Sequence, residues 1–212
     1  MSTTKKHTVD DLQAIADRIV GEAKGDEQIE VHVSRSNDTD IRVYQGEVEQ
    51  FTSAQSEGVG VRVIREGRTG FAYAGTLDPS VIGEVLADAR DNVEFGSVDE
   101  YAALATPDGV AVKPQVLWDE RLEQCGTDRK IELAKQLERL SLSGDSRVRV
   151  DSADYADGAG EAAVVTSTGI RASGRENGCY VSVSTLADDN GDTMTGFGFS
   201  DRKSTRLNSS HT

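Results

Sequence analysis

Hydrophobic and polar residues alternate along several stretches of the chain, most clearly between Tyr44 and Asp78. Valine occupies every second position from 59 to 63, which is the two-residue period of a β-strand. Glycines interrupt the apolar runs of this stretch, and Glu66-Gly67 has the composition of a hairpin turn. The stretch therefore predicts antiparallel strands joined by tight turns, with an apolar face that another layer must cover.

Helices are predicted to supply that cover. Apolar residues recur at helical spacing in three segments, near 9–24, 79–92 and 128–143. Thr8 and Asp11 have the spacing of a capping box before the first helix, and Asp78-Pro79 begins the second with a cap and a proline. Thr127 is expected to cap the third helix. Its inward-facing residues are expected to be Ile131, Leu133, Ala134, Leu137 and Leu140.

Further short strands are expected before and after these helices. A strand over 29–33 is expected to turn at Asn37-Asp38 into a second strand over 41–44. Later strands are expected over 148–155, 162–166, 170–173 and 179–186. The order of elements predicts an α+β fold with one or more mainly antiparallel sheets. One domain over 1–200 is expected, with two subdomains divided near 93–126 as an alternative.

Composition restricts the class of partner. The 212 residues carry a net charge of -14, which disfavours nucleic acid and anionic membranes because they would repel the chain. The N-terminus is polar, and no run of about 18 apolar residues occurs, so a soluble cytoplasmic protein is expected. Cys125 and Cys179 lack paired spacing, which favours a reducing compartment and thiols without a role in chemistry.

The last twelve residues, 201–212, depart from the alternation that precedes them. Residues 201–211 resemble the in-frame translation of a common short-read sequencing adapter. We therefore interpret 201–212 as a non-native tail and exclude it from fold and function. Because the tail carries more basic than acidic residues, the acidity belongs to the rest of the chain.

The histidines and the glycine-rich stretch do not have the patterns of catalytic or ligand-binding sites. A zinc protease needs two histidines one helical turn apart, whereas His7 lies in the terminus and His32 on the polar face of a strand. No serine nucleophile elbow accompanies His32. Gly58 and Gly60 lack the third glycine and the following helix of a nucleotide-binding loop, so they are interpreted as sheet residues.

Two groups of acids remain. The segment Asp188–Asp192 has oxygen ligands for calcium, but its spacing is not that of an EF-hand, and Asn190-Gly191 is a better hairpin turn. Glu47 and Glu49 could act as acid and base, although a solvated strand face is the favoured interpretation. The sequence therefore predicts no catalytic, cofactor-binding or metal-binding residue in this chain.

Three motifs nevertheless resemble one known family. They are Tyr44-x-Gly46-Glu47-Val48-Glu49, Gly58-Val59-Gly60-Val61-Arg62 and Gly67-x-Thr69-Gly70-Phe71-Ala72-Tyr73. Together they resemble the N-terminal domain of the TldD/PmbA peptidase family, also called modulators of DNA gyrase. The resemblance extends over residues 9–200.

The resemblance implies a cytosolic pair of TldD and PmbA (TldE) subunits that degrades or trims unfolded peptides. It places zinc on a His-Glu-x-x-x-His helix, with a further cysteine, in the C-terminal half of the TldD subunit. That half lies beyond this chain, so a missing C-terminal domain is expected, and the chain alone is expected to be inactive. No zinc ligand of the family transfers to a residue here.

Details outside the shared motifs are closer to PmbA than to TldD. They are Glu30-Val31-x-Val33-Ser34, Phe95-x-Ser97-x-Asp99 and the segment 176–192. The expected role is therefore that of a PmbA/TldE-like subunit that binds unfolded peptide and a TldD-type subunit or a second copy of itself. A non-enzymatic interaction or scaffold module is the alternative, and a hydrolase built on Glu47 and Glu49 is a third.

Overall fold

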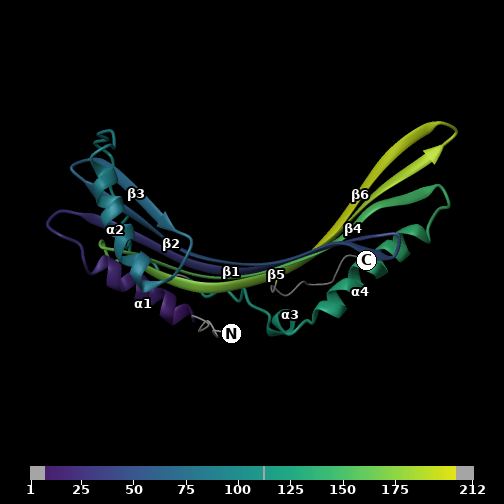
Figure 1. The fold of residues 1–212 in the computed structure, drawn as a ribbon, viewed down its shortest axis with the longest axis horizontal. Coiled ribbons are helices and arrows are strands. Elements are labelled where there is room, and N and C mark those ends of the chain that lie inside the picture. The colour runs from purple at the N-terminus through teal and green to yellow at the C-terminus, as the bar shows by residue number, and fades with distance from the viewer. Residues whose placement is uncertain (1–7, 112, 204–212) are drawn as a thin grey trace. The chain divides into compact units, whose positions relative to one another are not determined.

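The computed structural model describes residues 8–111 and 113–203. It has the predicted α+β fold, with six strands in the order β3-β2-β1-β4-β5-β6 (Figure 1). The helices are α1 (Val9–Val20), α2 (Pro79–Val93), α3 (Glu120–Glu123) and α4 (Thr127–Leu142). The strands are β1 (Gln28–Tyr44), β2 (Glu47–Arg65), β3 (Arg68–Ala74), β4 (Val148–Thr166), β5 (Arg171–Asp189) and β6 (Asp192–Lys203).

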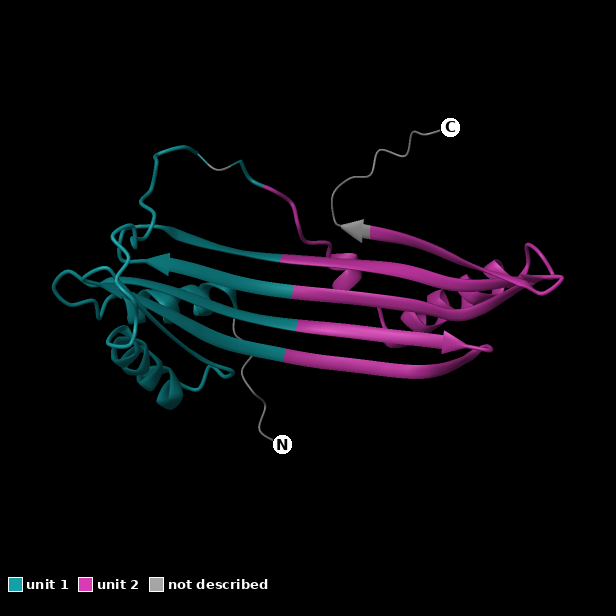
Figure 2. Cartoon of the chain, turned by 90° about the horizontal axis from the view of Figure 1, so that it is seen from above, with its two compact units in different colours: residues 1–36, 56–114, 160–175 teal, residues 37–55, 115–159, 176–212 magenta. Residues whose placement is uncertain are grey.

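The chain divides into two compact units, each built from three separate stretches (Figure 2). Unit 1 comprises 1–36, 56–114 and 160–175, and unit 2 comprises 37–55, 115–159 and 176–212. Each long strand contributes one segment to each unit. No helix in the described part of the chain is long and apolar enough to cross a membrane.

Unit 1 has a core between its strands and the helices α1 and α2. Its buried side chains include Leu12, Ala16 and Ile19 of α1, and Ile82, Val85, Leu86, Ala89 and Val93 of α2. Both predicted caps are present, because Asp11 N donates to Thr8 Oγ1 at 3.2 Å and Ser80 N donates to Asp78 Oδ1 at 2.9 Å. Valines at 59, 61 and 63 face this core, as their alternation predicts.

A glycine sets the distance between α2 and β3. A Cβ atom added at Gly70 would overlap the Ala89 carbonyl oxygen and lie 2.5 Å from the Val93 amide nitrogen. The backbone of β3 therefore contacts the backbone of α2 directly, which only glycine permits. The loop after α2 repeats this close approach, because a Cβ at Gly96 would lie 2.7 Å from the Thr69 oxygen.

Glu27 forms a buried ion pair beside this core. Its side chain is 5% exposed, and Arg90 donates to both carboxylate oxygens, from Nε to Oε1 at 3.1 Å and from Nη2 to Oε2 at 2.9 Å. The Lys24 amide adds a third hydrogen bond, and Arg65 lies 3.9 Å away. Burial raises the pKa of Glu27, but these hydrogen bonds and positive charges together lower it below its ordinary value of 4.5.

Unit 2 has a smaller core beneath α4. Ile41, Val43, Ala134 and Tyr155 are buried there, with Cys179 and Val181 half-buried beside them. The second buried residue of α4 is an acid, Glu138, which is only 3% exposed. Its carboxylate accepts a 2.8 Å hydrogen bond from the Gly46 amide, at the turn between β1 and β2. This bond ties the helix to the hairpin.

Replacing Glu138 by alanine is expected to lower the free energy of unfolding by about 2 kcal/mol, because the variant loses the charge-assisted hydrogen bond between the Gly46 amide and the buried carboxylate. Glu138→Gln keeps an acceptor oxygen and is expected to cost less. Gln136→Ala, at an exposed position of the same helix, is the control and is expected to change stability by under about 0.5 kcal/mol. Urea unfolding measures all three; equal losses for Glu138→Ala and Gln136→Ala would contradict the prediction.

The strands are longer than predicted. β1 continues without a turn through Asn37-Asp38, and β4 and β5 each join two segments that were expected to be separate. Reversals occur instead where the backbone has positive φ at two successive residues, as at Gln45-Gly46, Glu66-Gly67 and Asn190-Gly191. The Glu66-Gly67 and Asn190-Gly191 turns are therefore confirmed, whereas the Asn37-Asp38 turn is wrong.

The ends of the helices also differ in detail. α1 ends at Val20, earlier than predicted, and Gly126 instead of Thr127 is the N-cap of α4. Leu140 was expected to face inward but is 63% exposed, because α4 turns Glu138 inward at that end. Residues 201–203, expected to belong to a non-native tail, continue β6 beside β5, while 204–212 lie outside the described residues. The adapter interpretation stays a prediction.

Candidate peptide-binding face

One face of the sheet in unit 2 is not covered by its helix. In β1, Ile41 and Val43 point into the core under α4, so Asp40 and Arg42 lie on the opposite face by the alternation of a strand. In β5, Val181 packs on that core, so Tyr180 and Ser182 also lie on the opposite face. We call this surface the helix-free face.

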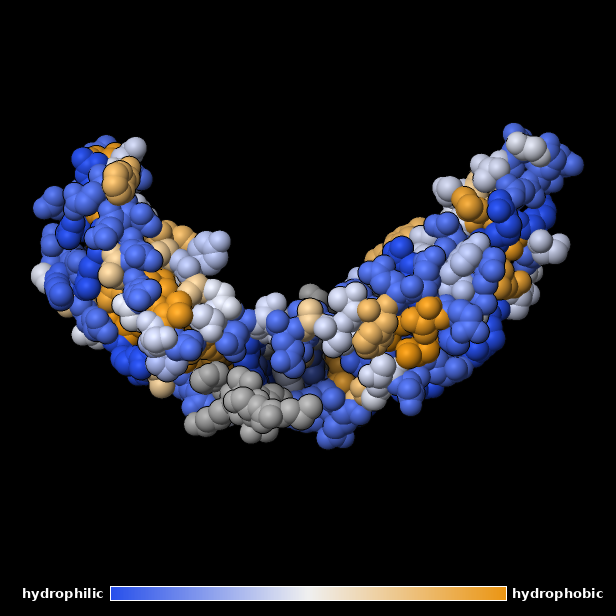
Figure 3. Space-filling model, viewed as in Figure 1, coloured by the Kyte–Doolittle hydropathy of each residue, from blue (hydrophilic) through white to orange (hydrophobic). Residues whose placement is uncertain are grey.

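Strand β6 adds two aromatic rings to the helix-free face. Phe199 pairs with Ser182 and Phe197 with Ser184, and paired residues of antiparallel strands share a face. Both phenylalanines are 70% exposed, with ring centroids 6.0 Å apart, and Tyr180 is 47% exposed beside them. Exposed hydrophobic side chains appear orange among hydrophilic ones in Figure 3. An exposed cluster of this kind indicates a binding surface.

Two grooves lie next to each other on this face. The first, of about 550 Å³, is lined by Tyr180, Ser182, Phe197 and Phe199 with Gly178, Cys179 and Asp201, and we call it the aromatic groove. The second, of about 290 Å³, is lined by Asp40, Arg42, Asp154, Tyr180 and Ser182 with Ile41, Gln50, Tyr155 and Ala156, and we call it the acidic groove. Since Tyr180 and Ser182 line both, the grooves are contiguous.

Arg42 is the cationic side chain in the acidic groove. Its Nε donates to Asp154 Oδ1 at 2.8 Å, and this hydrogen bond is the main cause that raises the pKa of the guanidinium. The charges of Asp154, Glu49 and Asp151 raise it further. Among the residues that line the groove, Asp40 and Asp154 are acidic and Arg42 is basic, so the groove keeps an excess of negative charge.

The outer side of β6 is the edge of the sheet in unit 2. β6 is the last strand in the order, so one row of its backbone N–H and C=O groups meets no other described strand. All its residues from 192 to 201 are exposed. Neither proline nor lysine occurs between 192 and 201, although these are the residues that commonly protect an edge. Such an edge can accept an extended segment as a further strand.

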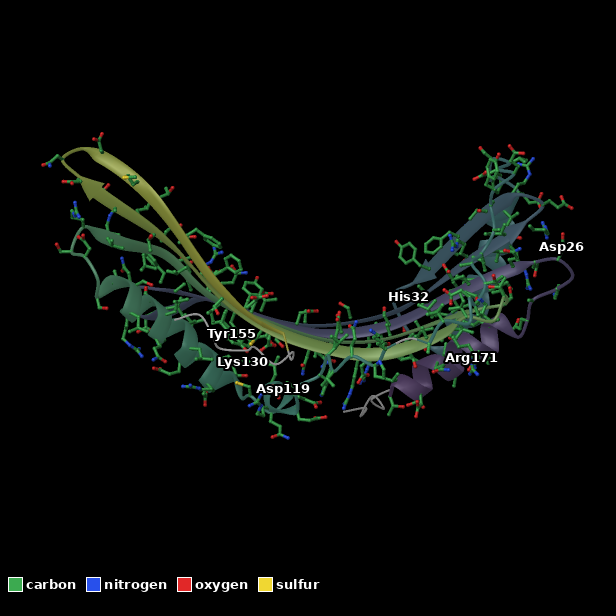
Figure 4. All side chains as sticks on the ribbon, turned by 180° about the vertical axis from the view of Figure 1, so that it is seen from behind. Asp26, His32, Asp119, Lys130, Tyr155 and Arg171 are labelled. Carbon is green, nitrogen blue, oxygen red and sulfur yellow. The ribbon has the colours of Figure 1, made fainter. Side chains whose placement is uncertain are left out.

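On the opposite side of the sheet, the Tyr155 hydroxyl is held by an ion pair between Asp157 and Lys130 (Figure 4). Its hydroxyl donates to Asp157 Oδ2 at 2.7 Å, and Lys130 Nζ lies 2.5 Å from the same oxygen. Burial, followed by the contact with Asp157, raises the pKa of the Tyr155 phenol, which therefore stays protonated. The Tyr155 hydroxyl therefore has its hydrogen-bond partner inside the protein, and we assign this side chain a structural role.

Unit 1 has a corresponding face with a different edge. Phe71 and Tyr73 of β3 are 54% and 76% exposed, with ring centroids 6.3 Å apart, and line a groove with His32. The edge of β3 is blocked, however, because Asn92 Nδ2 donates to the Phe71 carbonyl at 2.9 Å. The amide of Asp99 likewise donates to the Gly67 carbonyl at 2.7 Å. Strand addition is therefore open at β6 and obstructed at β3.

The candidates weighed in the sequence do not come together into a site. His32 is exposed on the polar face of β1, and His7 lies outside the described residues. Glu47 and Glu49 are exposed, and Lys135 Nζ lies 3.7 Å from Glu47. Gly58 and Gly60 lie within β2, so their interpretation as sheet residues is confirmed.

The acidic segment Asp188–Asp192 forms the predicted hairpin. Asp188 accepts from Thr193 and Arg149, and Asp189 binds Arg147. Neither Cys125 nor Cys179 forms a disulfide. Across the described residues, no three histidine, cysteine or acidic side chains are grouped to hold a metal ion.

The residues of the helix-free face were not selected from the sequence, although a signal was present. The alternation of Thr195, Phe197 and Phe199 after a hairpin turn indicates a strand with one aromatic face. Which face the helices cover depends on the packing of α4, which alternation within β6 does not reveal.

The fold and this face define an α+β protein of two units with an open sheet edge. Models of two successive domains match the chain: PmbA/TldA metallopeptidase domain 1 over residues 29–93, and PmbA/TldA metallopeptidase central domain over residues 120–209. The chain therefore belongs to the PmbA/TldD metallopeptidase family.

Individual proteins are similar to this chain in sequence or in fold. The uncharacterised protein MJ0231 of Methanocaldococcus jannaschii is 31% identical over 118 residues, which are 54% of this chain and 27% of that protein. TldE from Thermococcus kodakarensis has a similar fold, with a TM-score of 0.75 at 20% identity over 92% of this chain and 42% of that chain. A protein described as a modulator of a DNA gyrase, from Thermotoga maritima, gives 0.76 at 19% identity, covering 90% and 43%. The chain thus spans under half the length of each.

Proposed function

We propose that this chain acts as a PmbA/TldE-like subunit in the proteolysis of unfolded peptides, and that it binds extended peptide or a partner subunit through the helix-free face and edge of unit 2. The open edge of β6, beside exposed Phe197 and Phe199, is the observation that carries the proposal. Main-chain hydrogen bonds at a sheet edge depend little on the side chains of the added strand, so this mode of binding suits a protein that binds unfolded segments of varied sequence.

Zinc chemistry is assigned in this proposal to a TldD-type catalytic partner. The family implies a zinc ion, but the described residues of this chain do not suit one, because they include His32 as a lone exposed histidine and no cluster of three ligand side chains. No step of the reaction is therefore derived through a metal held by this chain. Its contribution is to bind and orient peptide for the partner.

A reconstituted assay tests the role. This chain, a TldD-type subunit and zinc are mixed, and the cleavage of an unfolded peptide is followed. We expect faster cleavage than with the TldD-type subunit alone, and a loss of that stimulation in the Phe197→Ser/Phe199→Ser variant. Met194→Ser is the control, because Met194 also lies on β6 and is 72% exposed, but it points to the opposite face from Phe197 and Phe199. Absence of stimulation would refute the role as a partner subunit.

A further inference from the structure

The aromatic groove and the acidic groove differ in chemistry although they touch. Phe197 and Phe199 make the aromatic groove apolar, while the carboxylates around Arg42 make its neighbour negative. Tyr180 stands between them, with a ring that both grooves share. A ligand that covers the face therefore meets an apolar surface and a negative surface in succession.

The spacing of these surfaces can be estimated from the sheet. Phe199 lies on β6, Tyr180 on β5 and Asp154 on β4, three successive strands in the order. Neighbouring strands are about 4.8 Å apart, so the two surfaces are separated by roughly 10 Å. An extended polypeptide rises about 3.3 Å per residue and points successive side chains to opposite sides, so residues two apart share a side at a distance of about 7 Å. The length of a lysine or arginine side chain covers the rest of the separation.

Charge determines which side chain suits the second surface. Asp40 and Asp154 outnumber Arg42 in the lining, and no other residue that lines the two grooves in the described chain is cationic. Glu49 and Asp151 add negative charge near the Arg42 guanidinium. An acidic side chain would be repelled there, whereas a lysine or arginine would be attracted. The exposed rings of Tyr180, Phe197 and Phe199 add cation–π attraction along the way.

We propose that the helix-free face of unit 2 binds an extended peptide segment that carries an apolar side chain and, two residues away, a lysine or arginine. The apolar side chain enters the aromatic groove and the cationic one reaches the acidic groove. This inference rests on the proposed peptide-binding function, with the peptide lying across the strands of the helix-free face, and names its preferred substrate class.

Fluorescence anisotropy with four labelled peptides tests the preference. All share one Gly/Ser/Thr sequence; the first carries leucine and lysine two residues apart, the second leucine and glutamine, the third leucine and glutamate, and the fourth serine and lysine. We expect the first to bind best, the exchange of lysine for glutamate to weaken binding about tenfold, and rising salt to reduce the difference. Loss of leucine is expected to weaken binding as well.

Variants assign the two surfaces. Phe199→Ser is expected to weaken the leucine peptides whatever their charge, whereas Met194→Ser has no effect. Asp40→Asn is expected to reduce the preference for lysine over glutamate by about threefold without changing the glutamine peptide. Glu132→Gln removes one negative charge from the exposed side of α4 and is the control for a general charge effect.

The outcomes separate this inference from the function on which it rests. Equal binding of the lysine, glutamine and glutamate peptides would overturn the charge preference and leave peptide binding intact. Binding of none of the four would overturn both. Concentration-dependent dimerisation that Phe199→Ser abolishes and Met194→Ser does not would show that a second copy occupies the face, and would also overturn the inference.

Discussion

Gly70→Ala is expected to lower the free energy of unfolding by about 3 kcal/mol, because the new methyl group has no space between β3 and α2. It would overlap the Ala89 carbonyl oxygen and approach the Val93 amide nitrogen to 2.5 Å. Both neighbours are backbone atoms, so a change of rotamer cannot relieve the contact. The helix must move away from the strand, which opens the core of unit 1.

Gly83→Ala is the matched control, since it makes the same substitution at a glycine of α2 where the added methyl group has space. Gly83 lies in α2, and a Cβ there would have no neighbour within 4 Å. Alanine stabilises an exposed helix position by about 1 kcal/mol relative to glycine. Thermal and urea unfolding should therefore shift in opposite directions for the two variants. A Gly70→Ala protein as stable as the parent would show that β3 does not pack on α2 at this distance.

The local signals in the sequence predicted the elements that local chemistry determines. The Thr8 capping box, the Asp78-Pro79 helix start and the Asn190-Gly191 turn depend on a few neighbouring residues, and each is present in the structure. The α+β class followed from the order of these elements. Such features need no knowledge of which segments pack together.

The length of the strands could not be predicted in the same way. Asn37-Asp38 has the composition of a turn, but β1 continues through it with exposed side chains. A polar pair breaks a strand only if the backbone gains by leaving the sheet, and here β2 and β4 continue beside β1. Pairing with neighbouring strands therefore outweighed a local preference for turns.

The residues of the candidate face could be predicted only in part, for the same reason. Alternation reveals that Phe197 and Phe199 share a face, but it does not reveal that this face continues the side of β1 and β5 opposite α4. Glu138 was missed for a related reason, because an acid on a helix is ordinarily solvated. Its burial depends on the Gly46 amide, a partner 92 residues away in the sequence.

The ion pair between Glu27 and Arg90 is expected to contribute strongly to the stability of unit 1. Glu27→Gln is expected to lower the free energy of unfolding by about 3 kcal/mol at pH 7, because it leaves the partly buried guanidinium of Arg90 without its counter-charge. Glu94→Gln is the control: Glu94 also binds Arg65, at 2.5 Å, but its side chain is 68% exposed. Exposed pairs contribute little, so its loss is expected to stay within about 1 kcal/mol.

The pH dependence of this difference follows from the lowered pKa of Glu27. A carboxyl whose pKa is lower in the folded state than in the unfolded chain stabilises the fold above the unfolded value, here 4.5. That stabilisation is lost as pH falls from there through the folded pKa. The parent and Glu27→Gln should therefore differ most at neutral pH and converge on acidification, as measured by urea unfolding at successive pH values. A difference that does not shrink below pH 4.5 would show that the charge of Glu27 is not what stabilises this part of unit 1.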